Sequence, residues 1–113
     1  MPVVFVSVDS KNTRLCEFKD LTEQLDIIYY SNTVEAECIL NKIREYTKVG
    51  RTILSDFLNP PEQHEMTDDI RKRVEYVVDD AYSWDVRSCM IISHHSVLNT
   101  WTPNFISEEW EIL

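Results

Sequence analysis

The chain has 113 residues, of which 20 are acidic and 11 are basic, so its formal net charge at pH 7 is −9. A surface this negative repels nucleic-acid phosphates and anionic lipids and attracts basic proteins, which argues against direct binding to nucleic acid or membranes. Gly50 is the single glycine. The chain therefore lacks the glycine-rich loops that cradle phosphates in P-loop, dinucleotide-binding and kinase-type enzymes.

The length and the 43% hydrophobic content predict a single globular domain over residues 1–113. Three widely spaced cysteines, Cys16, Cys38 and Cys89, indicate neither a disulfide framework nor a paired zinc site. The apolar N-terminus has no basic region and is too short for a signal segment or a membrane span. We therefore expect a reduced, cytoplasmic protein (in the host cytoplasm if the source is viral) that needs no cofactor.

The first third of the chain predicts a hairpin followed by a helix. Residues 3–8 are β-branched and aromatic, residues 9–12 have turn chemistry, and residues 14–18 can return as a second strand. Leu21, Leu25, Ile28 and Tyr29 then have helical spacing, which favours a helix, although residues 26–30 are also compatible with a short strand.

Two further helices are predicted in the middle of the chain. Asn32 or Thr33 caps the first, with acidic residues in its first turn, and Gly50 occupies the position expected after its end. Its apolar stripe consists of Val34, Ala36, Ile39, Leu40, Ile43 and Tyr46. A short helix over residues 53–58 is stopped by Asn59-Pro60-Pro61, and residues 59–66 form an exposed loop.

The strongest predicted helix begins at Thr67 and runs to about residue 83 or 84. Its buried face consists of Ile70, Val74, Val77, Val78 and Ala81. Residues 88–98 predict a strand, and residues 105–113 predict either a final strand or a single helical turn. Strands at both ends with helices between them indicate an α+β fold. In this fold the N- and C-terminal strands form an antiparallel sheet, and the helices pack on one face.

The histidines are candidates for chemistry only if partners come from elsewhere in the fold. His94 and His95 are neighbours on the predicted strand, so they point to opposite faces and at most one can serve a given site. His64 and Glu65 lie in the exposed loop, and Cys89 is expected to be a core residue. No residue is assigned a catalytic or metal-binding role.

The acidic residues of the C-terminal part predict a protein interface. After Arg73 the sequence has seven acidic residues and a single basic one, Arg87, and tyrosines and tryptophans are interspersed among them. Carboxylates mixed with such aromatic anchors are typical of protein interfaces, although they also suit a solvated face that keeps a protein soluble. The predicted partner-binding residues are Glu75, Asp79, Asp80, Asp85, Glu108, Glu109, Trp110 and Glu111.

Three functions are compatible with these features. The first is a small inhibitor or regulator that blocks a basic partner, for example a nuclease or another nucleic-acid-binding enzyme. Immunity proteins and viral anti-defence proteins that mimic nucleic acid are analogous in charge and size. The second is an accessory or structural subunit of a larger assembly, viral assemblies and homo-oligomers included. The third is a small enzyme or metal protein that uses His94 or His95.

Overall fold

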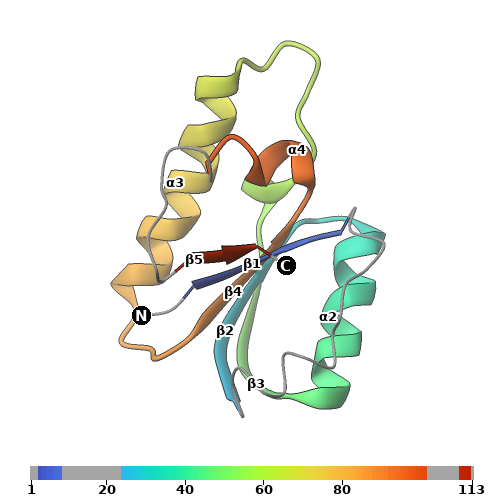
Figure 1. Cartoon of the computed structure of the whole chain (residues 1–113), viewed down its shortest axis with the longest axis vertical. Helices are drawn as coiled ribbons and strands as arrows, with labels where there is room; N and C mark the ends of the chain where they lie inside the picture. The colour runs from blue at the N-terminus through green and yellow to red at the C-terminus, as the bar shows by residue number, and fades with distance from the viewer. Residues whose placement is uncertain (1–2, 9–23, 102–109, 113) are drawn as a thin grey trace.

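The computed structural model describes residues 3–8, 24–101 and 110–112 (Figure 1). Within these residues, five strands form the sheet: β1 (Val3–Ser7), β2 (Gln24–Tyr30), β3 (Lys48–Leu54), β4 (Cys89–Ser93) and β5 (Trp110–Ile112). The helices of the same residues are α2 (Val34–Tyr46), the 3-10 helix η2 (Asp56–Leu58), α3 (Thr67–Ser83) and α4 (His95–Leu98).

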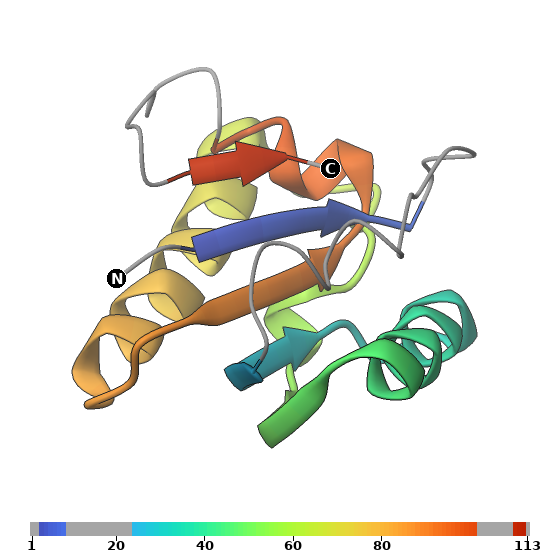
Figure 2. The same ribbon diagram turned by 60° about the horizontal axis from the view of Figure 1, so that its bottom comes forward.

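The strands form one sheet in the order β3-β2-β4-β1-β5, and every neighbouring pair is parallel. Helix α2 covers one face of the sheet, while α3 and α4 cover the other (Figure 2). The fold is therefore α/β, and the prediction of an antiparallel sheet with helices on one face is wrong. Parallel strands need crossover connections, and these place helices on both faces.

The central strands β1 and β4 are buried on both faces. On the α3 side, Val3, Phe5, Cys89 and Ile91 join the core, and on the α2 side, Val6, Met90 and Ile92 do so. Continuous apolar runs of this kind are typical of central strands in parallel sheets, because neither face meets water. The two apolar segments were correctly predicted as strands, but their partners were not.

Helix α2 confirms the prediction of a helix after Thr33. The Thr33 side chain caps the helix by accepting a hydrogen bond of 3.3 Å from the Ala36 backbone N–H. Ala36, Leu40 and Ile43 face the sheet and are buried. The helix ends at Tyr46, and β3 begins two residues later, so Gly50 lies within a strand and not at a helix end.

Edge strand β3 was not predicted because most of its residues are exposed or half-buried, so it lacks an apolar run. Gly50 has no positive φ there. Glycine is required here because the backbones of β2 and β3 approach each other closely. A Cβ atom at this position would lie 2.7 Å from the backbone oxygen of Asp26 in β2. Only η2 corresponds to the short helix predicted over residues 53–58.

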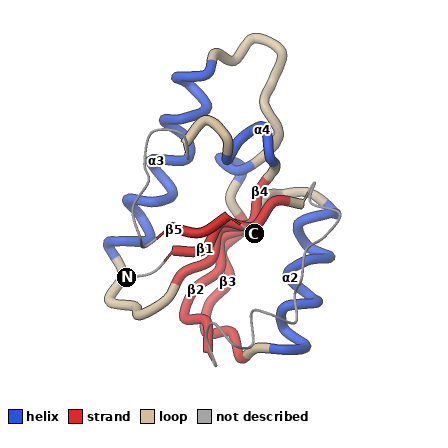
Figure 3. The backbone as a smooth tube through the Cα atoms, viewed as in Figure 1, coloured by secondary structure: helices blue, strands red, loops and turns tan. Residues whose placement is uncertain are grey.

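Helix α3 confirms the strongest helix prediction, and all five residues of its predicted inner face are buried. The Asp69 side chain accepts a hydrogen bond from the Met66 backbone N–H at the start of the helix. Residues 24–30 form strand β2 instead of the favoured helix. Strand β4 ends at Ser93 and α4 follows directly, so the predicted strand over residues 88–98 is too long (Figure 3).

Part of the sequence prediction falls outside the described residues, namely the turn at 9–12 and the return strand at 14–18. Strand β5 lies within the segment for which a final strand was one of two alternatives. In the part of the chain that the structure describes, no helix combines the length and apolarity required to cross a lipid bilayer.

Candidate functional site

The carboxyl ends of β2 and β4 form a topological switch point. The two strands are neighbours, but the chain leaves β2 for helix α2 on one face and leaves β4 for α4 on the other. Ligands of open parallel sheets bind in the crevice that this divergence creates. Ser31, Ser93 and His94 follow or end these strands and are all buried, and each forms a side-chain hydrogen bond that offsets the cost of its burial.

His94 and His95 lie in different surroundings. His94 is 8% exposed, and its Nε2 atom lies 3.2 Å from the Ser31 hydroxyl. That hydroxyl in turn lies 3.0 Å from the Thr33 hydroxyl, which caps α2. His95 is exposed in the first turn of α4. The prediction that the two side chains diverge is right, but they are not neighbours on a strand.

The connection from β3 to α3 is fastened across this carboxyl edge of the sheet. The Ser93 hydroxyl donates a 2.7 Å hydrogen bond to the backbone oxygen of Leu58. The backbone N–H of Asn32 donates a 2.7 Å hydrogen bond to the side-chain oxygen of Asn59. Residues that were predicted to form an ordinary exposed loop are thus fixed at their start to β4 and to the β2–α2 turn.

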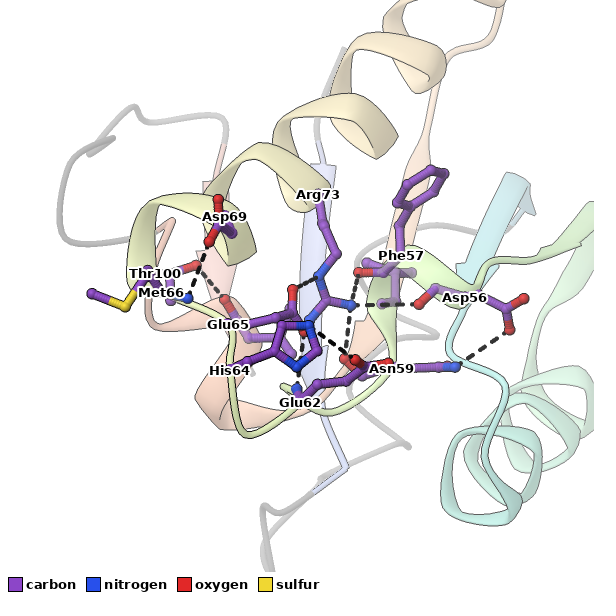
Figure 4. Close-up of polar contacts among 12 residues, drawn as sticks. Asp56, Phe57, Asn59, Glu62, His64, Glu65, Met66, Asp69, Arg73 and Thr100 are labelled. Atoms are coloured by element: carbon purple, nitrogen blue, oxygen red, sulfur yellow. Dashed lines mark hydrogen bonds and ion pairs between the residues drawn. The ribbon is translucent and has the colours of Figure 1, made fainter.

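Arg73 of α3 fixes the same connection from the other side (Figure 4). Its NH1 group donates hydrogen bonds to the backbone oxygens of Phe57 at 2.9 Å and Asn59 at 3.2 Å. Its Nε atom lies 3.0 Å from a carboxylate oxygen of Glu65, and both side chains are largely buried. The other Glu65 oxygen accepts a 2.9 Å hydrogen bond from the backbone N–H of Glu62.

A cleft of about 550 Å³ lies at this connection, and we name it the Arg73 cleft. Its lining consists of Leu54, Ser55, Asp56, Phe57, Glu62, His64, Glu65 and Arg73. The lining thus contains three acidic residues and one arginine, and of the three acids Glu65 is the one that forms an ion pair with Arg73. His64 is exposed and lies 3.4 Å from Glu62. No group of three or more metal-ligating side chains gathers anywhere in the described part of the chain, this cleft included.

Helix α3 presents acidic and aromatic side chains in two adjacent stripes. Residues three or four positions apart lie on one side of a helix, so Glu75, Asp79 and Tyr82 form one stripe, and Tyr76, Asp80 and Trp84 form the other. All are exposed except Asp80, which is half-buried.

The exposed aromatic residues gather on and beside α3. Among the side chains whose burial the structure describes, Phe57, Tyr76, Tyr82 and Trp84 are the aromatic ones that are more than a third exposed. The rings of Phe57 and Tyr76 lie 4.7 Å apart between centroids, which joins η2 to the helix. We call these four residues, together with Glu75, Asp79 and Asp85, the acidic–aromatic face.

Asp80 has internal partners. It accepts a 2.5 Å hydrogen bond from the buried Tyr29 hydroxyl and one of 3.4 Å from the Trp84 indole N–H. The guanidinium carbon of Arg51 lies 4.2 Å from the centre of the Trp84 ring. Asp80 therefore orients Trp84 at the end of the helix, with Arg51 of strand β3 stacked on the indole.

The predicted interface residues lie in several places. Glu75, Asp79 and Asp85 are exposed on or just after α3, whereas Glu108 and Glu109 fall outside the described residues. Trp110 and Glu111 belong to β5, at the edge of the sheet opposite β3. Spacing along α3 could have revealed its aromatic stripe. The contribution of Phe57 depends on how η2 docks against α3, which no local pattern indicates.

Cys89 is a fully buried core residue, as predicted, and burial raises the pKa of its thiol to about 12, so it is not an activated nucleophile.

Comparison of the chain with known protein families, with curated proteins and with solved structures found no match. The acidic–aromatic face, the Arg73 cleft and the switch point are the features of the molecule that can carry a function.

Proposed function

We propose that this protein binds a basic partner protein through the acidic–aromatic face and thereby inhibits or regulates that partner. The observation that carries the proposal is the gathering of four exposed aromatic side chains among carboxylates on and beside one helix. Aromatic residues dominate the energetic centres of interfaces, because they bury large areas with little loss of side-chain freedom. Nuclease-like or other nucleic-acid-binding proteins are the basic partners that suit such a surface.

The charge and the aromatics have different roles in this proposal. The net charge of −9 attracts a basic partner from a distance and speeds association, and salt weakens this effect. The aromatic side chains slow dissociation once they are buried. An accessory subunit held by apolar contacts, which is the alternative function, would bind with little dependence on salt.

The test begins with a tagged pull-down from the native source at low and high salt, with captured proteins identified by mass spectrometry. The affinity of the purified partner is then measured for the wild type and for two triple variants. We expect Glu75→Lys, Asp79→Lys and Asp85→Lys together to weaken binding at least a hundredfold. The reversal of Glu35, Glu37 and Glu45 on α2 changes the net charge equally, and it should weaken binding less than tenfold.

We expect both variants to remain folded, because all six substituted side chains are exposed. Thermal unfolding of each variant checks this. Equal weakening by the two variants would indicate that only overall charge matters, and unchanged binding in the first would refute an acidic interface.

The buried position of His94 at the switch point favours small-ligand binding as a second candidate function. If His94→Ala and His95→Ala both leave the function of the protein intact, the candidate function that uses these histidines is eliminated.

A further inference from the structure

We propose that the Arg73 cleft receives an arginine side chain of the basic partner, as the anchor of the interface. This inference rests on the proposed function, because it assigns the chemistry that one part of the partner must supply. Phe57 belongs to both surfaces: its ring packs on Tyr76 of the acidic–aromatic face, and it also lines the cleft. A partner that covers one surface would therefore reach the other.

The charges of the cleft fit a cationic side chain. Glu65 is already neutralised by Arg73, and both side chains are largely buried, at 15% and 17% exposure. Asp56 and Glu62 remain, and no lysine or arginine in the described part of the chain forms an ion pair with either of them. The Glu62 side chain is 71% exposed and can reorient toward a bound cation. A guanidinium that enters the cleft thus meets two carboxylates that have only neutral or histidine neighbours, Asn59 beside Asp56 and His64 beside Glu62.

The apolar walls favour arginine over lysine. Phe57 is 43% exposed and Leu54 is 48% exposed, so an aromatic ring and an aliphatic side chain are both available for contact. A planar guanidinium stacks on an aromatic ring while its N–H groups bind carboxylates at its edge, whereas an ammonium group lacks this geometry. Arg51 on Trp84 is an example of the same stacking elsewhere on this protein.

The cleft is also held in shape before any partner arrives. Arg73 binds the backbone oxygens of Phe57 and Asn59, and the Ser93 hydroxyl binds that of Leu58. The Asn59 side chain donates a 3.3 Å hydrogen bond to Asp56. A pocket whose backbone is fixed by its own contacts loses little conformational entropy on binding, so more of the contact energy appears as affinity.

The direct test is an NMR titration of the folded protein with an acetyl-Gly-Arg-Gly-amide peptide. The matched control peptide replaces arginine by citrulline, which keeps the shape of the side chain but removes its charge. We expect saturable shifts of the backbone amides of residues 54–65 with the arginine peptide and at least fivefold weaker binding of the citrulline peptide. Equal binding of both peptides, or shifts confined to the exposed acids of α3, would overturn the proposal.

Two variants sharpen the test. Asp56→Asn with Glu62→Gln removes the negative charges of these two side chains but keeps their hydrogen-bonding oxygen atoms. This variant should bind the arginine peptide at least fivefold more weakly than the wild type does. Glu35→Gln with Glu45→Gln makes the same charge change on α2, outside both the cleft and the acidic–aromatic face, and should leave the titration unchanged. If the two variants bind the arginine peptide equally well, the cleft is not the receptor of the side chain.

The same cleft variant, measured against the identified partner, separates this inference from the proposed function. We expect it to weaken partner binding at least tenfold. If the lysine reversals on α3 abolish binding while the cleft variant binds normally, the protein interface stands and the arginine anchor is refuted. If neither variant alters partner affinity, the proposed function and the inference that rests on it both fail.

Discussion

At the scale of single residues, Gly50 shows how one backbone contact constrains an exposed strand. A Cβ atom at this position would lie 2.7 Å from the Asp26 oxygen, closer than such atoms can approach. We expect Gly50→Ala to lower the free energy of unfolding by about 1–3 kcal/mol, because β2 and β3 must move apart. Urea denaturation measures this, and Lys48→Ala, an exposed change on the same strand, should stay within about 0.5 kcal/mol of wild type. Equal stability of Gly50→Ala and wild type would contradict the close approach.

Tyr29 gives the protein a dependence on alkaline pH. Burial of the ring, then the hydrogen bond to Asp80 and the charge of Asp80, raise the pKa of Tyr29 far above its ordinary value of 10.0. The folded pKa exceeds the unfolded one, so the contribution to stability is complete below pH 10.0 and is lost as the pH rises beyond that value.

We therefore expect the midpoint of thermal unfolding to fall as the pH is raised above about 10. Spectrophotometric titration of the native protein should show Tyr29 ionising well above its ordinary pKa of 10.0. Asp80→Asn removes the negative charge and should lower the pKa of Tyr29 toward, but not to, its ordinary value, since burial remains. If Tyr29 of the wild type ionises at its ordinary pKa of 10.0, the burial of its hydroxyl and its bond to Asp80 are wrong.

At the scale of elements, the β3–α3 connection depends on Arg73. Removing the guanidinium leaves the largely buried Glu65 carboxylate without its ion-pair partner and frees the backbone oxygens of Phe57 and Asn59. We expect Arg73→Ala to lower the free energy of unfolding by about 2 kcal/mol or more. Hydrogen exchange should accelerate at residues 57–65, whereas Lys72→Ala, the exposed neighbour on α3, should change neither quantity. Unaltered exchange in Arg73→Ala would show that other contacts hold the connection.

Helices and strands were predictable from the sequence where their own residues show the spacing or the capping residue that is typical of the element. Helix α3 has an apolar face at helical spacing, and α2 has a capping threonine, so both were found. Strand β3 is an edge strand that contains Lys48, Gly50 and Arg51, and its stability comes from pairing with β2. Strand β2 itself has apolar residues that suit either a helix or a strand, and its neighbours on both sides decide between them.

At the scale of the whole molecule, the pairing of the strands was the part that local patterns could not supply. Val3–Ser7 and Cys89–Ser93 are apolar on both faces, which was a signal for helices on both sides of a parallel sheet. The turn-like residues after β1 favoured a hairpin instead. Of the candidate surfaces, the acids of α3 were predicted from the sequence. The Arg73 cleft was not, because it assembles β3, η2, the following loop and α3.

The strand order also determines when the protein can fold during its synthesis. Strand β1 is flanked by β4 and β5, so both of its edges pair with segments that are synthesised more than 80 residues after it. Until Cys89 has emerged, the apolar N-terminal strand has no partner, and β2 lacks its neighbour β4. During the synthesis of the residues between β1 and β4, the apolar strand β1 therefore stays unpaired, and in this period a chaperone would have its greatest effect on the yield of native protein.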